Sequence, residues 1–150
     1  MRSNGFYAGG LMLALALLAG GCHRGMGPAS DRVQALSQLP YPKDAPLGDD
    51  LDIIAVRKGG TLQLANRTPQ AYHHVQIWLN RQYVSEVTDV AIGVDNHYSL
   101  HDFVNMHRET FPVGTLLAPD KAKPVVLAEM FDPSTGKRYR MTVQLKQQRG

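Results

Sequence analysis

The chain contains six histidines, a residue type that often binds zinc or copper, so a metal site is the first chemistry to test. His73 and His74 are adjacent in a segment with strand periodicity, and adjacent strand residues point to opposite faces. His97 and His101 could share a face, but four strand residues span about 13 Å, which is too far for one ion. His101 and His107 are six residues apart and do not align on a helical turn. A metal site would therefore need a histidine cluster assembled from different strands.

The sequence has no recognisable arrangement for nucleophilic catalysis. It lacks the Gly-x-Ser-x-Gly motif that exposes a serine on a sharp turn in many hydrolases. Ser99, His101 and Asp102 are close in sequence, but their spacing does not position them as a triad. Acidic residues such as Asp49 and Asp52 do not form the dense ladder of a calcium-binding loop. We therefore expect neither enzymatic activity nor a bound cofactor or metal.

An alternation of aromatic and polar residues points instead to a binding surface. In the strand expected over residues 72–79, Val75, Ile77 and Leu79 share one face. The opposite face carries Tyr72, His74, Gln76 and Trp78, and Tyr83 lies nearby across the next turn. If exposed, this face would suit a sugar or a protein partner. The alternative is that Trp78 is buried beneath a sheet edge or the loop 104–119, because large aromatic residues are mostly buried.

The only cysteine, Cys22, follows a short apolar segment. Residues 11–18 are uninterruptedly apolar, but a membrane-spanning helix needs about 20 residues. Such a short run near a weakly positive start is typical of a secretory signal. Small residues, Ala19, Gly20 and Gly21, separate the run from Cys22. With one cysteine, no disulfide can form within this sequence.

This arrangement resembles the lipobox of bacterial lipoproteins. In that family the cysteine is diacylated and a dedicated peptidase cleaves just before it, so the resemblance implies a signal peptide over residues 1–21 and a lipid on Cys22. Ala19 departs from the family pattern, in which leucine is commonest. The alternative is a plain secretory signal cut after Gly20 or Gly21. A single acyl chain binds a bilayer only marginally, whereas two or three anchor a protein stably.

The same resemblance implies where the protein resides. An aspartate after the lipidated cysteine often retains such proteins in the inner membrane, and this chain has His23 instead. We therefore expect a membrane as one partner, bound through the lipid on Cys22. If the host has two membranes, we expect the domain to lie at the outer membrane and to face the periplasm.

The overall composition fits one ordinary globular domain. The 150 residues are 43% hydrophobic and 19% charged, a balance that argues against a wholly disordered chain. The net charge is +3, and the most basic segment, residues 137–140, alternates with apolar residues as the solvated face of a strand would. Nucleic-acid binding needs a concentrated basic surface, so we expect no nucleic-acid partner.

Residues 22–50 have the composition of a flexible, lipid-attached spacer. Three prolines between positions 40 and 46 favour an extended, semi-rigid chain. Ser30 can cap a short helix over residues 31–38 that ends before the first of these prolines. Two helical turns are marginal alone, so this helix should fray or lie against the domain.

From residue 51 the hydrophobic periodicity changes to two, which predicts strands. Seven or eight short strands with frequent turn signals predict an all-β, antiparallel sandwich over residues 51–147, with a barrel as the alternative. Its rhythm resembles immunoglobulin-like and fibronectin-like domains. Residues 125–131 are nearly all apolar and predict a central strand covered on both faces. Residues 138–146 alternate cleanly and predict a strand with one solvated face.

These features predict a membrane-anchored lipoprotein of the cell envelope whose β domain is a non-enzymatic interaction or structural module. The chain is broadly similar to small bacterial lipoproteins of uncharacterised role, a similarity that implies no activity. The alternative is an envelope protein that binds a glycan or a metal through the Tyr72/Trp78 face or a histidine cluster. In either case the expected further partner is an envelope protein or a glycan.

Overall fold

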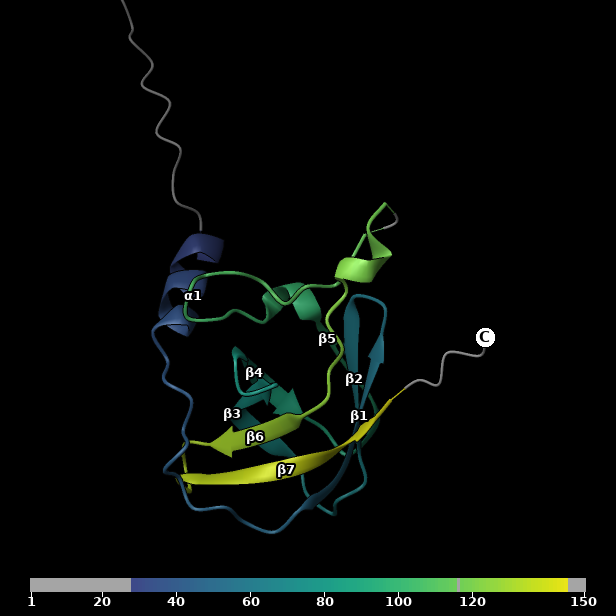
Figure 1. Cartoon of the computed structure of the whole chain (residues 1–150). Coiled ribbons are helices and arrows are strands. Elements are labelled where there is room, and N and C mark those ends of the chain that lie inside the picture. Colours follow the sequence, from purple (N-terminus) through teal and green to yellow (C-terminus); the bar gives the residue numbers. More distant parts are fainter. Residues whose placement is uncertain (1–27, 116, 146–150) are drawn as a thin grey trace, which may run out of the picture.

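The computed structural model describes residues 28–115 and 117–145 (Figure 1). Within these ranges one α-helix, α1 (Pro28–Ser37), precedes seven strands. They are β1 (Leu51–Lys58), β2 (Thr61–Asn66), β3 (Tyr72–Leu79), β4 (Tyr83–Val90), β5 (Gly93–Ser99), β6 (Ala128–Asp132) and β7 (Lys137–Gln144). Two short 3-10 turns, η1 (Leu100–Asp102) and η2 (Pro119–Lys121), lie between β5 and β6. The predicted all-β class is confirmed.

The seven strands form one hydrogen-bonded sheet in the order β4-β3-β6-β7-β1-β2-β5. Every neighbouring pair is antiparallel except β1 and β7, which are parallel. The sequence predicted antiparallel strands in two sheets. Instead, β7 pairs with β6 on one side and with β1 on the other, and so joins the two halves into one sheet.

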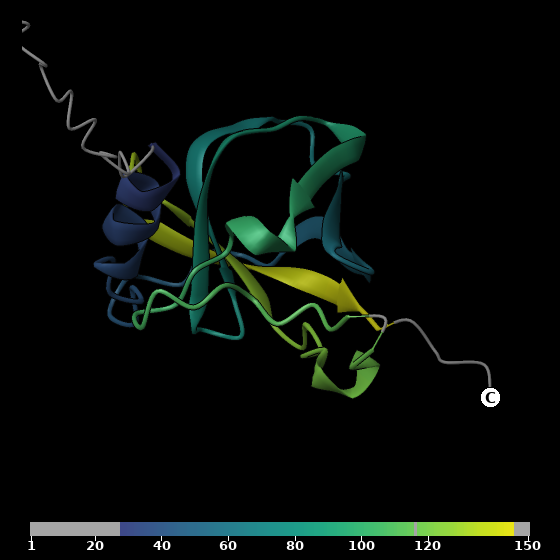
Figure 2. The same cartoon turned by 90° about the horizontal axis from the view of Figure 1, so that it is seen from above.

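The sheet curls around the core because its two edge strands are almost adjacent in sequence. Only Ala91 and Ile92 separate β4 from β5, which lie at opposite ends of the strand order. Across a flat sheet of seven strands these ends would be about 29 Å apart, too far for two residues. Figures 1 and 2 show the half with β3, β4 and β6 facing the half with β1, β2 and β5. The packing is therefore sandwich-like or barrel-like, as predicted.

Asn96 of β5 fixes the point where the two edges meet. Its Nδ2 donates to the carbonyl of Ala91 at 2.8 Å and to that of Leu64 at 3.2 Å. Its Oδ1 accepts from the Ala91 N–H at 2.8 Å. The buried Asn96 side chain thus provides hydrogen-bond partners for the backbone N–H and carbonyl of Ala91, in the turn between β4 and β5.

Strand alternation fills the main core much as the sequence predicted. Leu62 and Leu64 of β2 are fully buried on one face. In β7, Met141 is buried and Val143 packs partly against the core, but Leu145 beyond the strand is 63% exposed. The alternation therefore predicted the inward face of β7 but extended it past the end of the strand at Gln144.

Residues 28–50 pack on the domain, which corrects the expected flexible spacer over its described part. The helix begins at Pro28 and ends at Ser37, close to the predicted range 31–38. Leu36 is buried against the sheet, at 3% exposure. Further along, the Gly48 N–H donates to the carbonyl of Arg138 at 2.8 Å, and the Arg138 N–H donates to Pro46 at 2.9 Å. Apolar side chains and backbone pairing thus hold this segment in place.

Candidate functional site

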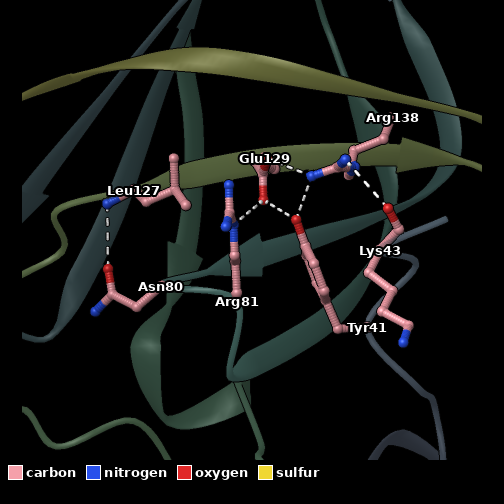
Figure 3. Close-up of polar contacts among 7 residues, drawn as sticks. All are labelled: Tyr41, Lys43, Asn80, Arg81, Leu127, Glu129 and Arg138. Carbon is pink, nitrogen blue, oxygen red and sulfur yellow. Dashed lines mark hydrogen bonds and ion pairs between the residues drawn. The ribbon is translucent and has the colours of Figure 1, made fainter. Parts of the chain in front are cut away.

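The most extensively bonded buried charge in the described chain is the carboxylate of Glu129 on β6 (Figure 3). Its Oε1 accepts from Arg138 Nη1 at 2.9 Å, and its Oε2 accepts from the Tyr41 hydroxyl at 2.6 Å. Arg81 Nε lies 3.6 Å from Oε2. We call these four residues the Glu129 cluster. The side chain of Glu129 is 0% exposed, and burying a carboxylate is tolerable only with partners of this kind.

The Glu129 cluster combines the β6–β7 hairpin with two segments that are distant from it in sequence. Residue 129 lies on the face of β6 opposite Met130, which points into the main core. Arg138 comes from β7, the strand that pairs with β6, and its direct cross-strand partner is Phe131. The sequence predicted Arg138 to be solvated, but Tyr41 covers it and its side chain is only 13% exposed. The packed N-terminal segment is what buries this arginine.

Tyr41 connects the N-terminal segment to the sheet. Burial, followed by the hydrogen bond and negative charge of Glu129, raises the pKa of the Tyr41 hydroxyl above its usual value. The guanidinium groups of Arg81 and Arg138 lie 5.8 Å and 5.4 Å from the ring centroid. The ring also meets Trp78 edge-on, with 5.4 Å between centroids. Tyr41 is therefore a neutral hydrogen-bond donor at physiological pH.

A tight turn places Arg81 beside the Glu129 cluster. Asn80 and Arg81 both have positive φ, 52° and 57°, a backbone conformation that asparagine tolerates in tight turns. The Asn80 Oδ1 accepts from the N–H groups of Val126 and Leu127, and its Nδ2 donates to the carbonyl of Pro124 at 2.9 Å. Figure 3 shows the contact with Leu127. Asn80 therefore fixes the turn to the segment that precedes β6, while the Arg81 side chain remains 52% exposed.

A groove of about 660 Å³ lies next to the Glu129 cluster. Its lining comes from residues 36–41, the β3–β4 turn and the loop 104–109. Trp78 and Tyr83 add aromatic surface, and Arg81, His107 and Glu109 add polar groups. An apolar lining with a few polar groups is the usual character of a ligand site.

The loop wall of the groove is held in shape by Asn105. Its Oδ1 accepts from the N–H groups of His107 and Glu109, both at 2.9 Å. Its Nδ2 donates to the Glu109 carboxylate at 2.7 Å. Val104 exchanges two backbone hydrogen bonds of 2.9 Å with Val84 on β4. Hydrogen bonds within the chain therefore fix the shape of this wall.

The residues predicted to form an aromatic-polar face do not lie together on an exposed surface. His74 is exposed, Gln76 is half-buried, and the other three are buried: Tyr72, Trp78 and Tyr83. Trp78 is covered by Leu36 of α1, Val84 and Val104, so the alternative of a buried tryptophan describes its position. The cover includes the N-terminal helix, which was expected either to fray or to lie against the domain, as well as Val104 of the loop 104–119.

A local change in β3 explains why Tyr72 leaves the expected face. His74 has a φ of 51°, which interrupts the alternation of side chains. Tyr72 therefore packs in the main core together with Val75. Tyr83 joins the same core and meets Phe111 edge-on at 5.0 Å between ring centroids.

The histidines are spread over the surface. The five in the described chain are all exposed, and His73 forms a 2.5 Å contact with the Asp89 carboxylate. Among residues 28–115 and 117–145, no three histidine, cysteine or acidic side chains gather closely enough to bind a metal. Ser99 Oγ accepts from the His101 N–H at 3.3 Å and caps η1, which accounts for the proximity of Ser99, His101 and Asp102.

The predicted lipid-attachment residue, Cys22, and the signal segment over residues 1–21 lie outside the described residues. Within the described ranges, no helix has the length and apolar character needed to cross a bilayer.

Comparisons with known proteins found no similar chain. No protein-family model matches the sequence, and no curated protein or solved structure matches it either.

Glu129 is the residue that the sequence prediction missed, and a signal for it was present. It stands within the nearly continuous apolar segment 125–131, for which the sequence predicted a central strand covered on both faces. The strand is central, but it begins only at Ala128, and Val126 before it is 61% exposed. A glutamate in such a strand must find a cationic or hydrogen-bonding partner. The sequence could not identify that partner, because Tyr41 and Arg81 come from other parts of the chain.

Proposed function

We propose that this chain is a lipid-anchored lipoprotein of the bacterial cell envelope whose β domain is a non-enzymatic interaction module. The observation that carries the proposal is Cys22, the only cysteine, placed directly after small residues and the apolar run 11–18. His23 favours the outer membrane, with the domain facing the periplasm, if the host has two membranes.

The described structure supports an anchored module in two ways. First, α1 begins at Pro28, six residues after Cys22, so at full extension at most about 22 Å of chain separates the lipid from the domain. Second, the Glu129 carboxylate is satisfied inside the cluster, because both of its oxygens accept hydrogen bonds from neighbours in the cluster. This bonding suits a structural connection between the anchored segment and the sheet.

The substitution Cys22→Ser tests the anchor. We expect the parent chain to fractionate with membranes and to leave them only in detergent, because two or three acyl chains bind a bilayer stably. Cys22→Ser should move to the soluble fraction, while a control variant, His23→Ala, should stay with membranes. Mass spectrometry of the mature parent chain should show acyl mass on the residue-22 sulfur. A Cys22→Ser chain that remains membrane-bound would contradict the proposal.

The groove gives a second candidate function, the binding of a glycan or an extended peptide. It is favoured over metal binding because the groove combines aromatic surface with the half-exposed guanidinium of Arg81 at one rim. Arg81→Gly removes that group and suits the positive φ of the position.

Binding of the lipidated chain to glycan and peptide arrays tests this second candidate. For a ligand held in the groove, Arg81→Gly should weaken binding at least tenfold. The control Arg140→Ala removes an exposed arginine of β7 and should leave binding unchanged. A ligand whose affinity is equal in the parent chain and in both variants would place the binding surface elsewhere.

A further inference from the structure

We propose that one end of the domain, which we call the loop end, lies against the membrane surface and places Met106 and Leu117 among the lipid headgroups. The loop end consists of the first turn of α1, the loop 103–113 and the described part of the loop 114–122, which is residues 114–115 and 117–122. This inference rests on the proposed lipid at Cys22 and adds the orientation in which the anchored domain meets the bilayer.

The first observation is the exposure of apolar side chains. Six large apolar residues are exposed in the described chain, with exposed fractions between 45% and 95%. The two most exposed are Leu117 at 95% and Met106 at 75%, and both lie at the loop end. Moving such exposed leucine and methionine side chains into the boundary between headgroups and acyl chains lowers the free energy, because apolar surface leaves water.

The second observation is the arrangement of the segments. In Figure 1 the helix α1 starts at the top, where the loops 103–113 and 114–122 (both green) also lie. Figure 2, seen from above, looks onto these same segments. The segment 42–50 and the β6–β7 hairpin lie at the opposite end in Figure 1. The exposed apolar residues of the two loops are thus at the end where the chain from Cys22 enters the domain.

The third observation is the short connection to the anchor. At most about 22 Å of chain links Cys22 to Pro28, so the start of α1 must stay near the bilayer. The helix cannot swing freely, because Leu36 is buried and Arg32 Nη2 donates to the carbonyl of Glu86 on β4 at 3.1 Å. A fixed helix on a short connection turns the loop end, rather than the opposite end, toward the lipid.

The loops carry polar chemistry that fits this orientation. Arg108 and Lys121 are exposed beside the two apolar residues, and long cationic side chains place their charge among headgroup phosphates while their stems cover apolar surface. The loops also keep their shape without a partner. Asn105 fixes one of them, and in the other a Cβ at Gly114 would come within 2.9 Å of Ala122 Cβ.

Fluorescent labels on single introduced cysteines test the orientation. The lipidated, full-length chain is placed in phospholipid vesicles with an environment-sensitive label at Met106→Cys or Leu117→Cys. The matched control is Leu47→Cys, an exposed leucine of the segment 42–50 at the opposite end. The sulfur of a lipidated Cys22 is a thioether, so the introduced thiol is the only one that reacts.

We expect labels at positions 106 and 117 to be quenched by nitroxide-bearing lipids and to be at least fivefold less sensitive to aqueous iodide than the label at position 47. Equal iodide quenching at all three positions would overturn this inference alone. Protection from iodide without quenching by the nitroxide lipids would also overturn it, because a second copy or another protein would then cover the loop end. A parent chain that takes up label at Cys22 and does not float with vesicles would overturn the anchor, and this inference with it.

Discussion

The Glu129 carboxylate shows how one buried charge can organise several segments. Removing one partner of a buried ion pair typically costs about 3–5 kcal/mol, because the other charge is left without compensation. Glu129 has Arg138 as its close cationic partner and Tyr41 as its neutral donor, while Arg81 lies at 3.6 Å. The contacts with Tyr41 and Arg81 therefore make the fold depend on segments far away in sequence.

Tyr41→Phe should lower the free energy of unfolding by about 2 kcal/mol at pH 7, because a buried carboxylate loses a hydrogen bond. The folded-state pKa of Tyr41 is raised above 10.0, so its contribution is complete below about pH 10 and is lost as pH rises through that raised value. The difference between parent and variant should shrink above pH 10. Urea unfolding at several pH values measures this difference.

Tyr98 serves as an internal reference for this alkaline titration. Burial, with a smaller effect of Asp89, raises the pKa of Tyr98 to about 12. Since Tyr98 is present in both proteins, its titration cancels in the comparison. A gap between parent and Tyr41→Phe that stays constant from pH 7 to pH 11 would contradict the proposed role of the hydroxyl.

At the residue scale, the sequence predicted side-chain direction better than burial. Trp78 does face away from Val75 and Ile77, as strand parity requires, and it packs in a separate cluster. Its cover, however, includes Leu36, more than 40 residues earlier, which no local pattern reveals. Tyr72 was placed wrongly because the positive φ of His74 is a backbone irregularity that histidine rarely adopts.

The N-terminal segment behaves as a structural element of the domain. Backbone hydrogen bonds join residues 46–48 to Arg138, and Gly48 allows this close approach. A Cβ at Gly48 would lie 2.4 Å from Tyr139 Cε1, so a side chain there must push the ring aside. The glycine therefore lets the segment lie directly on β7.

Gly48→Ala should lower the free energy of unfolding by about 1–3 kcal/mol through overpacking against Tyr139. The matched control is Gly60→Ala, since no atom lies within 4 Å of a Cβ there. That control should be neutral or stabilising by up to about 1 kcal/mol. Thermal unfolding followed by circular dichroism compares the two; equal stability of both variants would show that the contact with Tyr139 relaxes without cost.

At the element scale, the sequence predicted strands but not their pairing. The bounds of β3 agree with the predicted range 72–79, and β1 begins at residue 51, where the predicted change of periodicity lies, because each strand carries its own alternation. The parallel contact of β1 with β7 depends on partners about 90 residues apart, so no local periodicity could predict it.

The whole molecule is closed by a few side-chain contacts where the edges of the sheet meet. Asn96 bonds both backbone groups of Ala91 in the short connection between β4 and β5. Nearby, Asn66 Nδ2 donates to the carbonyl of Val90 at the end of β4 at 3.1 Å. These amides hold the two halves of the curled sheet together, so removing them should lower the stability of the entire domain.

Asn96→Ala should lower the free energy of unfolding by about 2–4 kcal/mol, because the N–H and carbonyl of Ala91 lose their bonds to the buried side chain. Urea unfolding followed by Trp78 fluorescence and by far-ultraviolet circular dichroism should give one coincident transition for both probes. Thr88→Ala, at an exposed position of β4, should change stability by less than about 0.5 kcal/mol. A stable Asn96→Ala protein would show that the closure does not depend on this amide.

The central place of β7 has a consequence for how the protein is made. Ribosomes synthesise a chain from its N-terminus, and β7 is the last described strand to emerge, yet it lies between β6 and β1. Until residues 137–144 are available, the strands β4, β3 and β6 cannot be joined to β1, β2 and β5. A nascent chain therefore cannot complete this sheet until residues 137–144 have been synthesised, and its earlier strands must wait in two unjoined groups.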